Sequence, residues 1–350
     1  MYLYIKLLRY FKQLCKNMKR GKKMVQKKEK NNLRSSLLLL VLAVTLLISS
    51  SYAWFTSNQT VTVSSLNVNV EAKNGLQIST DGTSWKSIIQ NTDITTANAT
   101  YPTSVNQVPT VLEPISTSGN VTDAKLDMFY GVVGTNTDGD YILSTLKQTD
   151  VEGNGVDAGR YIAFDLFFKV EKDTPVYIST NSGVKSKEGV ASRGLENAAR
   201  IAFIDQGNTS AGSAIATIQG LNNGNTASTK IWELNYDVHT AAAVANAYDT
   251  YGQTTTTTGG TRLPYYGVKA EMAETDNILL KNAKDTNFFE EVTPTISTVS
   301  GFATNQSLTT LKAGITKMRI YMYVEGQDVD CENNASGADI TFDLQVTTNI

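Results

Sequence analysis

Histidine and cysteine are scarce in this chain of 350 residues, and their scarcity limits the chemistry that it can perform. The single histidine is His239, so a zinc site that needs two histidines, such as His-Glu-x-x-His, cannot form. A Ser-His-Asp triad would have to use His239, yet no Gly-x-Ser-x-Gly motif accompanies it. We interpret His239 as a hydrogen-bonded structural residue near a helix start; the alternative is the catalytic base of a secreted hydrolase.

The two cysteines, Cys15 and Cys331, lie on opposite sides of the only long apolar segment. If that segment is a cleaved export signal, Cys15 is removed with it, and the mature chain cannot form an internal disulfide. We interpret Cys331 as a buried, small apolar residue. A nucleophile or an intermolecular bridge is the alternative.

Positive charge is scarce outside the first 36 residues. The chain has 31 Lys and Arg against 33 Asp and Glu, of which residues 1–36 hold twelve basic residues and one acidic residue. The remainder therefore carries 19 basic and 32 acidic residues, a net charge of about −13. Phosphate contacts require Lys and Arg, so the acidic body excludes nucleic acid as a partner. The basic head favours the cytoplasmic side of a membrane.

An apolar run from Leu37 to Ile48 follows this basic head and ends in Ser51-Tyr52-Ala53. Such a layout is typical of a secretory signal, and it predicts cleavage between Ala53 and Trp54 by signal peptidase. The protein would then be secreted or held at the cell surface. The alternative is an uncleaved membrane anchor, because residues 37–55 approach the length of a span.

The sequence thus divides into a basic cytoplasmic n-region (1–36), the apolar core and cleavage site of a signal peptide (37–53) and an extracellular domain (54–350). The first segment is long for an n-region, so translation from Met18 or Met24 is an alternative to Met1. Any contact with a membrane is expected only through these N-terminal segments.

The extracellular part has the alternating pattern of β-strands. Residues 60–70 alternate in two runs, with a phase slip at Ser64-Ser65 that predicts a bulge or a short turn. The predicted inward-facing residues are Val61, Val63, Leu66, Val68 and Val70. Residues 161–170 are apolar on both faces, which indicates a central strand, and residues 175–179 are predicted as its neighbour.

Further strands are predicted at 76–85 (a hairpin around Asp81-Gly82), 126–133, 140–143, 317–325 and 338–346. Many short strands with long polar loops predict a mainly β fold. We expect a single antiparallel β-sandwich or jelly-roll-like domain with one or two short helices, preceded by a helical signal or transmembrane segment.

Three carboxylates, Asp328, Asp330 and Glu332, alternate in the loop between the last two predicted strands. Carboxylate oxygens are suitable ligands for calcium, which makes these residues the main candidate metal site; Asn136, Asp138 and Asp140 around Gly139 are a weaker one. The twelve-residue calcium-loop pattern with its central glycine is absent, however, so a solvated turn is the alternative. No other cofactor is indicated.

The segment Ser51-Tyr-Ala-Trp-Phe-Thr-Ser-Asn58 resembles that of exported Gram-positive bacterial proteins whose signal peptides are processed by the SipW-type signal peptidase. The best-known members are the TasA and camelysin proteins, which are fibre components of biofilm matrix. The resemblance covers about residues 34–70. It implies cleavage after Ala53, followed directly by a first mature strand.

Together these observations favour a non-enzymatic structural protein of the cell surface or biofilm matrix. Its partners would be further copies of itself or other matrix or cell-wall components. Strand 60–70 could form fibres by completing a neighbour's sheet; the alternative is that it pairs within its own sandwich. The competing functions are an extracellular adhesin or binding module, with calcium as an aid, and a secreted hydrolase that depends on His239.

Overall fold

The computed structural model describes residues 60–71, 75–148, 159–189, 192–241, 243–245, 247, 262–279, 285–331 and 337–349. Within this part of the chain, no helix is both long enough and apolar enough to cross a membrane. The predicted signal segment 37–53 and its cleavage residues Ala53 and Trp54 lie outside the described residues.

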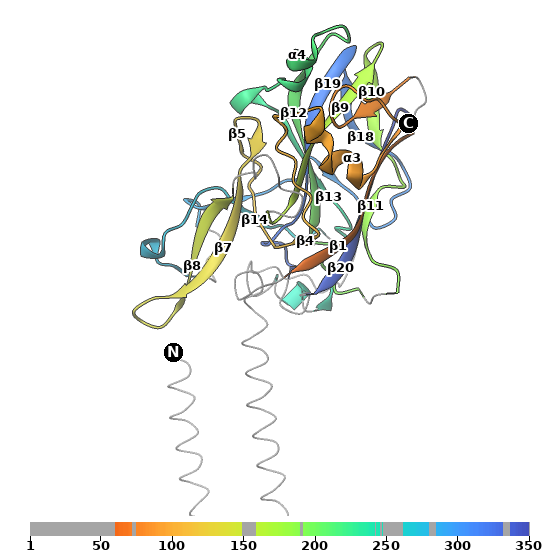
Figure 1. Cartoon of the computed structure of the whole chain (residues 1–350). Helices are drawn as coiled ribbons and strands as arrows, with labels where there is room; N and C mark the ends of the chain where they lie inside the picture. Colours follow the sequence, from red (N-terminus) through yellow and green to blue (C-terminus); the bar gives the residue numbers. More distant parts are fainter. Residues whose placement is uncertain are drawn as a thin grey trace, which may run out of the picture.

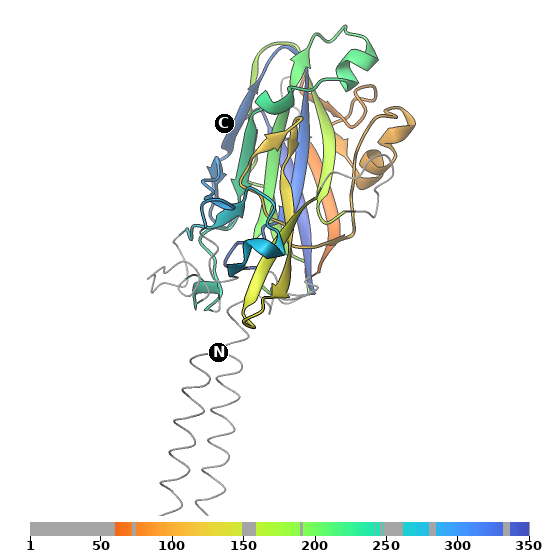
Figure 2. The same ribbon diagram turned by 90° about the vertical axis from the view of Figure 1, so that its left-hand side faces the viewer.

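Two sheets make up the body of the protein (Figure 1). The first sheet has the order β18 (Gln306–Leu311), β10 (Thr174–Ile178), β20 (Ala338–Thr347), β1 (Val61–Glu71) and β3 (Ile88–Ile89), and in addition β11 (Gly183–Ser186) pairs with β20 and β4 (Val111–Leu112) with β1. The second has the order β17 (Ile296–Ser297), β13 (Thr229–Glu233), β12 (Ala199–Thr209), β19 (Gly314–Val324), β9 (Ile162–Val170) and β2 (Gln77–Ser79). The axes of the long strands in the two sheets are roughly aligned with one another (Figure 2).

The two sheets share one apolar core. Side chains of the first sheet, such as Leu66 and Phe342, belong to the same buried cluster as Phe164 and Ile320 of the second. This packing is that of a β-sandwich, and it confirms the prediction of a mainly β fold with few, short helices.

Smaller elements cover the outer face of the second sheet or extend from the body. They are β14 (Tyr266–Val268) with β16 (Phe289–Glu291), β5 (Val121–Thr122) with β6 (Lys125–Leu126), and a three-stranded sheet of β15 (Ile278–Leu279), β8 (Tyr141–Gln148) and β7 (Met128–Thr135). The short helices are α3 (Asn91–Thr95), α4 (Ile215–Gln219), η1 (Ala97–Ala99), η2 (Gly224–Thr226) and η3 (Glu274–Asp276). The β7–β8 hairpin extends away from the sandwich (Figure 1).

Because of this cover, β19 is buried on both of its faces. Met318 and Met322 face the core between the sheets, whereas Tyr321 and Tyr323 pack in a second cluster beneath the covering segments. The same outer face carries charged side chains of the second sheet, which therefore become buried as well.

Two details differ from the sequence predictions. Residues 175–179 are not the neighbour of 161–170: β10 belongs to the first sheet and pairs with β18 and β20, whereas β9 lies between β19 and β2 in the second. The short connection after β9 thus crosses between the sheets instead of closing a hairpin. In addition, β1 and β20 run parallel, because the first and last described strands enter the sandwich from the same end.

Candidate functional site

Strand β1 has the inward-facing set that its sequence predicts. Val61, Leu66, Val68 and Val70 are buried, and Val63 packs against the same core. The register to β20 shifts between Val63 and Ser65, so the predicted bulge is confirmed at that point. Because of the bulge, the apolar side chains before it and those after it face the same core.

The contact of β1 with β20 is continuous. Ten pairs run from Val61 opposite Ala338 to Glu71 opposite Thr347. On the outer face, Asn67 Nδ2 donates to Asp343 Oδ1 at 2.7 Å, and Thr347 Oγ1 donates to Glu71 Oε2 at 3.2 Å. Side chains therefore fix the same register as the backbone.

Within the part of the chain that the structure describes, the opposite edge of β1 is paired only near its two ends. β4 pairs with Val61 and Thr62, and β3 pairs with Val68 and Asn69. One further hydrogen bond on the β4 side runs from Val63 N to Thr110 O at 2.8 Å, and one on the β3 side from Val70 N to Ser87 O at 2.9 Å. Strand β1 thus depends mainly on β20 for its place in the sheet.

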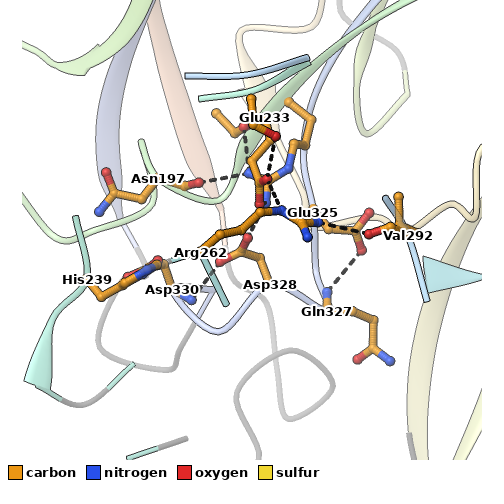
Figure 3. Close-up of polar contacts among 12 residues, drawn as sticks. Asn197, Glu233, His239, Arg262, Val292, Glu325, Gln327, Asp328 and Asp330 are labelled. Atoms are coloured by element: carbon orange, nitrogen blue, oxygen red, sulfur yellow. Dashed lines mark hydrogen bonds and ion pairs between the residues drawn. The ribbon is translucent and has the colours of Figure 1, made fainter. Parts of the chain in front are cut away.

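Two of the predicted calcium ligands, Asp328 and Asp330, lie in a different environment, a buried charge cluster that we define as Arg200, Glu233, His239, Arg262, Glu325, Asp328 and Asp330 (Figure 3). It occupies the outer face of the second sheet and the loop that follows β19.

Arg200 is the centre of this cluster. Its guanidinium is fully buried, and Nη2 donates both to Asp328 Oδ2 and, at 3.0 Å, to Glu233 Oε1. The second oxygen of Glu233 accepts from Arg262 Nε at 2.5 Å. Burial opposes the charge of Arg200, but the two carboxylates outweigh it and raise the pKa of the guanidinium. Two arginines thus neutralise two carboxylates, which allows Arg200, Glu233 and Asp328 to lie in the protein interior, whereas Arg262 stays partly exposed.

Asp330 pairs with the only histidine. His239 Nδ1 and Asp330 Oδ2 are 2.7 Å apart, and the Asp330 N–H donates to Asp328 Oδ1 at 2.9 Å. Burial raises the pKa of Asp330, and the hydrogen bond from His239 acts against this rise. The structure therefore gives His239 the hydrogen-bonded position that the sequence indicates. As a hydrolase residue, His239 remains an untested prediction.

Glu325 has no arginine or lysine within ion-pair distance among the described residues, although it is completely buried. Its Oε1 accepts from the Gln327 N–H at 3.1 Å and its Oε2 from the Thr117 N–H at 3.4 Å. Burial raises the pKa of Glu325 to about 8, even though these hydrogen bonds and Arg200 favour the charged form. Glu325 is therefore mostly protonated at neutral pH.

These contacts bear on the calcium prediction. Asp328 and Asp330 are buried and engaged by Arg200 and His239, and Glu332 lies outside the described residues. Among the described residues, no group of three or more His, Cys, Asp or Glu side chains could hold a metal. A cation at Asp328 would have to displace an arginine, and the alternative of a solvated turn does not describe these buried residues either.

Arg200, Glu233 and Arg262 were not singled out from the sequence. The available signal is a lone charge inside an apolar strand, as in Ala199-Arg-Ile-Ala-Phe and Ile231-Trp-Glu-Leu. Such a charge must find a partner when both faces of its strand are covered. The identity of the partner depends on strand order, which the sequence does not state.

A second group of charges lies near the start of β19 and on the neighbouring strand β9. Asp165 Oδ1 accepts from Arg319 Nη1 at 2.9 Å, and Asp165 Oδ2 lies 3.3 Å from Lys317 Nζ and accepts from the Tyr101 hydroxyl at 2.8 Å. Burial opposes ionisation of Asp165, but Arg319 and Lys317 outweigh burial and lower its pKa. These hydrogen bonds and ion pairs join the four side chains, so the group attaches the loop that carries Tyr101 to β9 and β19.

No protein family, curated protein or solved structure matches this chain.

Proposed function

We propose that this protein is a secreted, non-enzymatic structural component of the cell surface or biofilm matrix, and that copies of it assemble by exchanging β1. Export would depend on signal peptidase acting at Ala53–Trp54. The observation that supports assembly is the position of β1, which is the first described strand and forms ten pairs with β20 but has only two-residue strands on its other edge.

This arrangement suits an exchange because β1 is held mainly by one neighbouring strand, β20. If β1 leaves, it opens a slot that is lined by β20 on one side and by β3 and β4 on the other. Unpaired strand edges attract another strand. A β1 from a second copy carries the same valines and the same bulge, so it can fill the slot with identical contacts.

Gly75 lies at the end of the connection between β1 and β2, with φ of +75° and no atom within 4 Å of an added Cβ. Glycine adopts this conformation at no steric cost.

A disulfide between β1 and β20 tests the exchange. Asn67 and Asp343 are register partners with touching side chains, and neighbouring strands about 4.8 Å apart are within reach of a disulfide. In the double variant N67C/D343C, oxidation of monomers should lock β1 in its own sheet and prevent assembly, and reduction should restore it. Oxidation after assembly should instead join neighbouring chains into a covalent ladder on a non-reducing gel.

The single variant N67C is the control, since it leaves the buried Cys331 as the only other mature thiol. A stapled monomer that still assembles as fast as the wild type would refute exchange of β1. A purified mature chain that never assembles would refute the structural role itself.

A further inference from the structure

A groove of about 240 Å³ opens between one edge of the first sheet and one edge of the second. β11 lines it from the first sheet, and the segments that flank β12, β13 and β17 line it from the second. This groove is separate from the β1–β20 contact and from the carboxylates of the buried charge cluster.

Asn197 is the polar residue that distinguishes the groove. It is only 6% exposed, and its backbone is fixed, because its N–H donates to Gly194 O at 2.9 Å and its carbonyl accepts from Arg200 Nη1 at 2.8 Å. Among the described residues its side-chain amide has no hydrogen-bond partner, and Figure 3 shows that amide pointing away from the charge cluster. Neither atom of this amide is among the side-chain atoms closed off from solvent, so the amide can donate and accept within the groove that Asn197 lines.

Glu196, the adjacent residue, adds a second polar atom without a partner. Its Oε1 accepts from the Ser192 hydroxyl, whereas its Oε2 is buried and makes no hydrogen bond among the described residues. Because Oε2 is closed to solvent, the polar groups that a ligand can reach at this wall are the acceptor and the NH₂ donor of the Asn197 amide.

The other walls supply the Ser300 hydroxyl and one apolar surface, formed by Val238 and Phe302. Ser182 also lines the groove, but its hydroxyl already donates to Gln345 O at 3.0 Å and accepts from Gln345 N at 2.8 Å. The Phe302 ring is held edge-on against Trp232, with centroids 6.0 Å apart and an interplanar angle of 83°. Val238 is 43% exposed. The groove therefore combines fixed polar groups with a rigid apolar side.

We propose that this groove binds a single neutral sugar unit of a glycan. Sugar hydroxyls both donate and accept, as the Asn197 amide requires, and the C–H face of a sugar ring suits Val238 and Phe302. The volume lies below the roughly 300 Å³ at which pockets for drug-sized ligands begin, so one ring fits but a longer chain has to extend into solvent.

A peptide strand is the less suitable occupant. Strand addition requires free backbone groups at the edge of β11, but the carbonyl of Val184 already accepts from Asn235 Nδ2 at 3.2 Å. One Lys and one Glu side chain, Lys185 and Glu196, line the groove, so its lining has no excess charge that would favour an ion over a neutral ligand.

The test measures saturation-transfer NMR and titration with methyl glycosides of glucose, galactose, mannose and N-acetylglucosamine. It uses the full chain in a detergent without a sugar headgroup. We expect at least one glycoside to bind with millimolar affinity, and N197A to weaken it about tenfold through the loss of two hydrogen bonds. The control N98A removes an exposed asparagine outside the groove and should leave binding unchanged.

If N197A does not fold, the nearly isosteric N197D replaces it; loss of the amide donor beside Glu196 should weaken binding by a similar factor. Absence of binding for all four glycosides would overturn the proposal. It would also fail if binding were unchanged in the folded Asn197 variants, or if acetyl-trialanine amide bound in the groove in preference to every glycoside. None of these results depends on whether β1 is exchanged.

Discussion

Glu325 makes the stability of this protein depend on pH in a predictable way. An increase in its pKa from 4.5 to about 8, at about 1.4 kcal/mol per pH unit, corresponds to about 4 to 5 kcal/mol. That is a large share of the roughly 5 to 15 kcal/mol by which domains are usually stable. Complete burial of the side chain means that solvent does not screen this effect.

The sign follows from proton binding. Between pH 4.5 and about 8 the folded protein keeps a proton on Glu325 that the unfolded chain releases. The free energy of unfolding therefore falls as pH rises through this window and levels off above it. The variant E325Q resembles the protonated side chain, so it should match the wild type near pH 4.5 and exceed its stability by up to about 4 kcal/mol above pH 8.

Urea denaturation of the chain from residue 54 onward, at intervals between pH 4.5 and 9, measures this difference. Asp330 also has a pKa raised by burial, but it contributes equally to both proteins and cancels. The matched control E290Q alters an exposed carboxylate of β16 and should follow the wild-type profile. Wild-type and E325Q curves that stay parallel across the window would show that Glu325 is ionised in the folded protein.

Two further substitutions test the close packing around the covering segments. R200M should lower the free energy of unfolding by about 3 kcal/mol or more, because it leaves Asp328 buried without its cation. Adding D328N to R200M should recover part of this loss. If the losses of the two single variants simply add in the double variant, a direct pairing is contradicted. G267A should cost more than about 2 kcal/mol, since an added Cβ would lie 2.0 Å from the carbonyl oxygen of Thr117. G212A, which meets no atom within 4 Å, is its control and should unfold within about 1 kcal/mol of the wild type in the same urea titration.

The sequence predicted local features of the fold well. The phase slip in residues 60–70 marks the bulge between Val63 and Ser65, and the strands predicted at 126–133 and 140–143 meet in the β7–β8 hairpin. Both depend on side chains near one another in the chain, where alternation and turn chemistry act directly.

Long-range pairing was less predictable. Residues 175–179 follow β9 closely, yet β10 joins the other sheet. Asp328 and Asp330 suggest a solvated loop or a cation site by spacing alone, but Arg200 and His239 engage them from distant parts of the chain. Neither partner can be assigned before the order of the strands is known.

The sequence by itself determined the separation of a basic head from an acidic body, the β character of the fold and the inward face of β1, because these follow from composition and from period-two alternation. Only the tertiary structure decided that β1 pairs in parallel with β20, that the outer face of the second sheet is buried, and that Asn197 lines a groove without a partner. The physical reason is that burial of both faces of a sheet depends on loops far away in sequence. Burial is also what turns ordinary Arg, Glu and Asn residues into groups that must find partners.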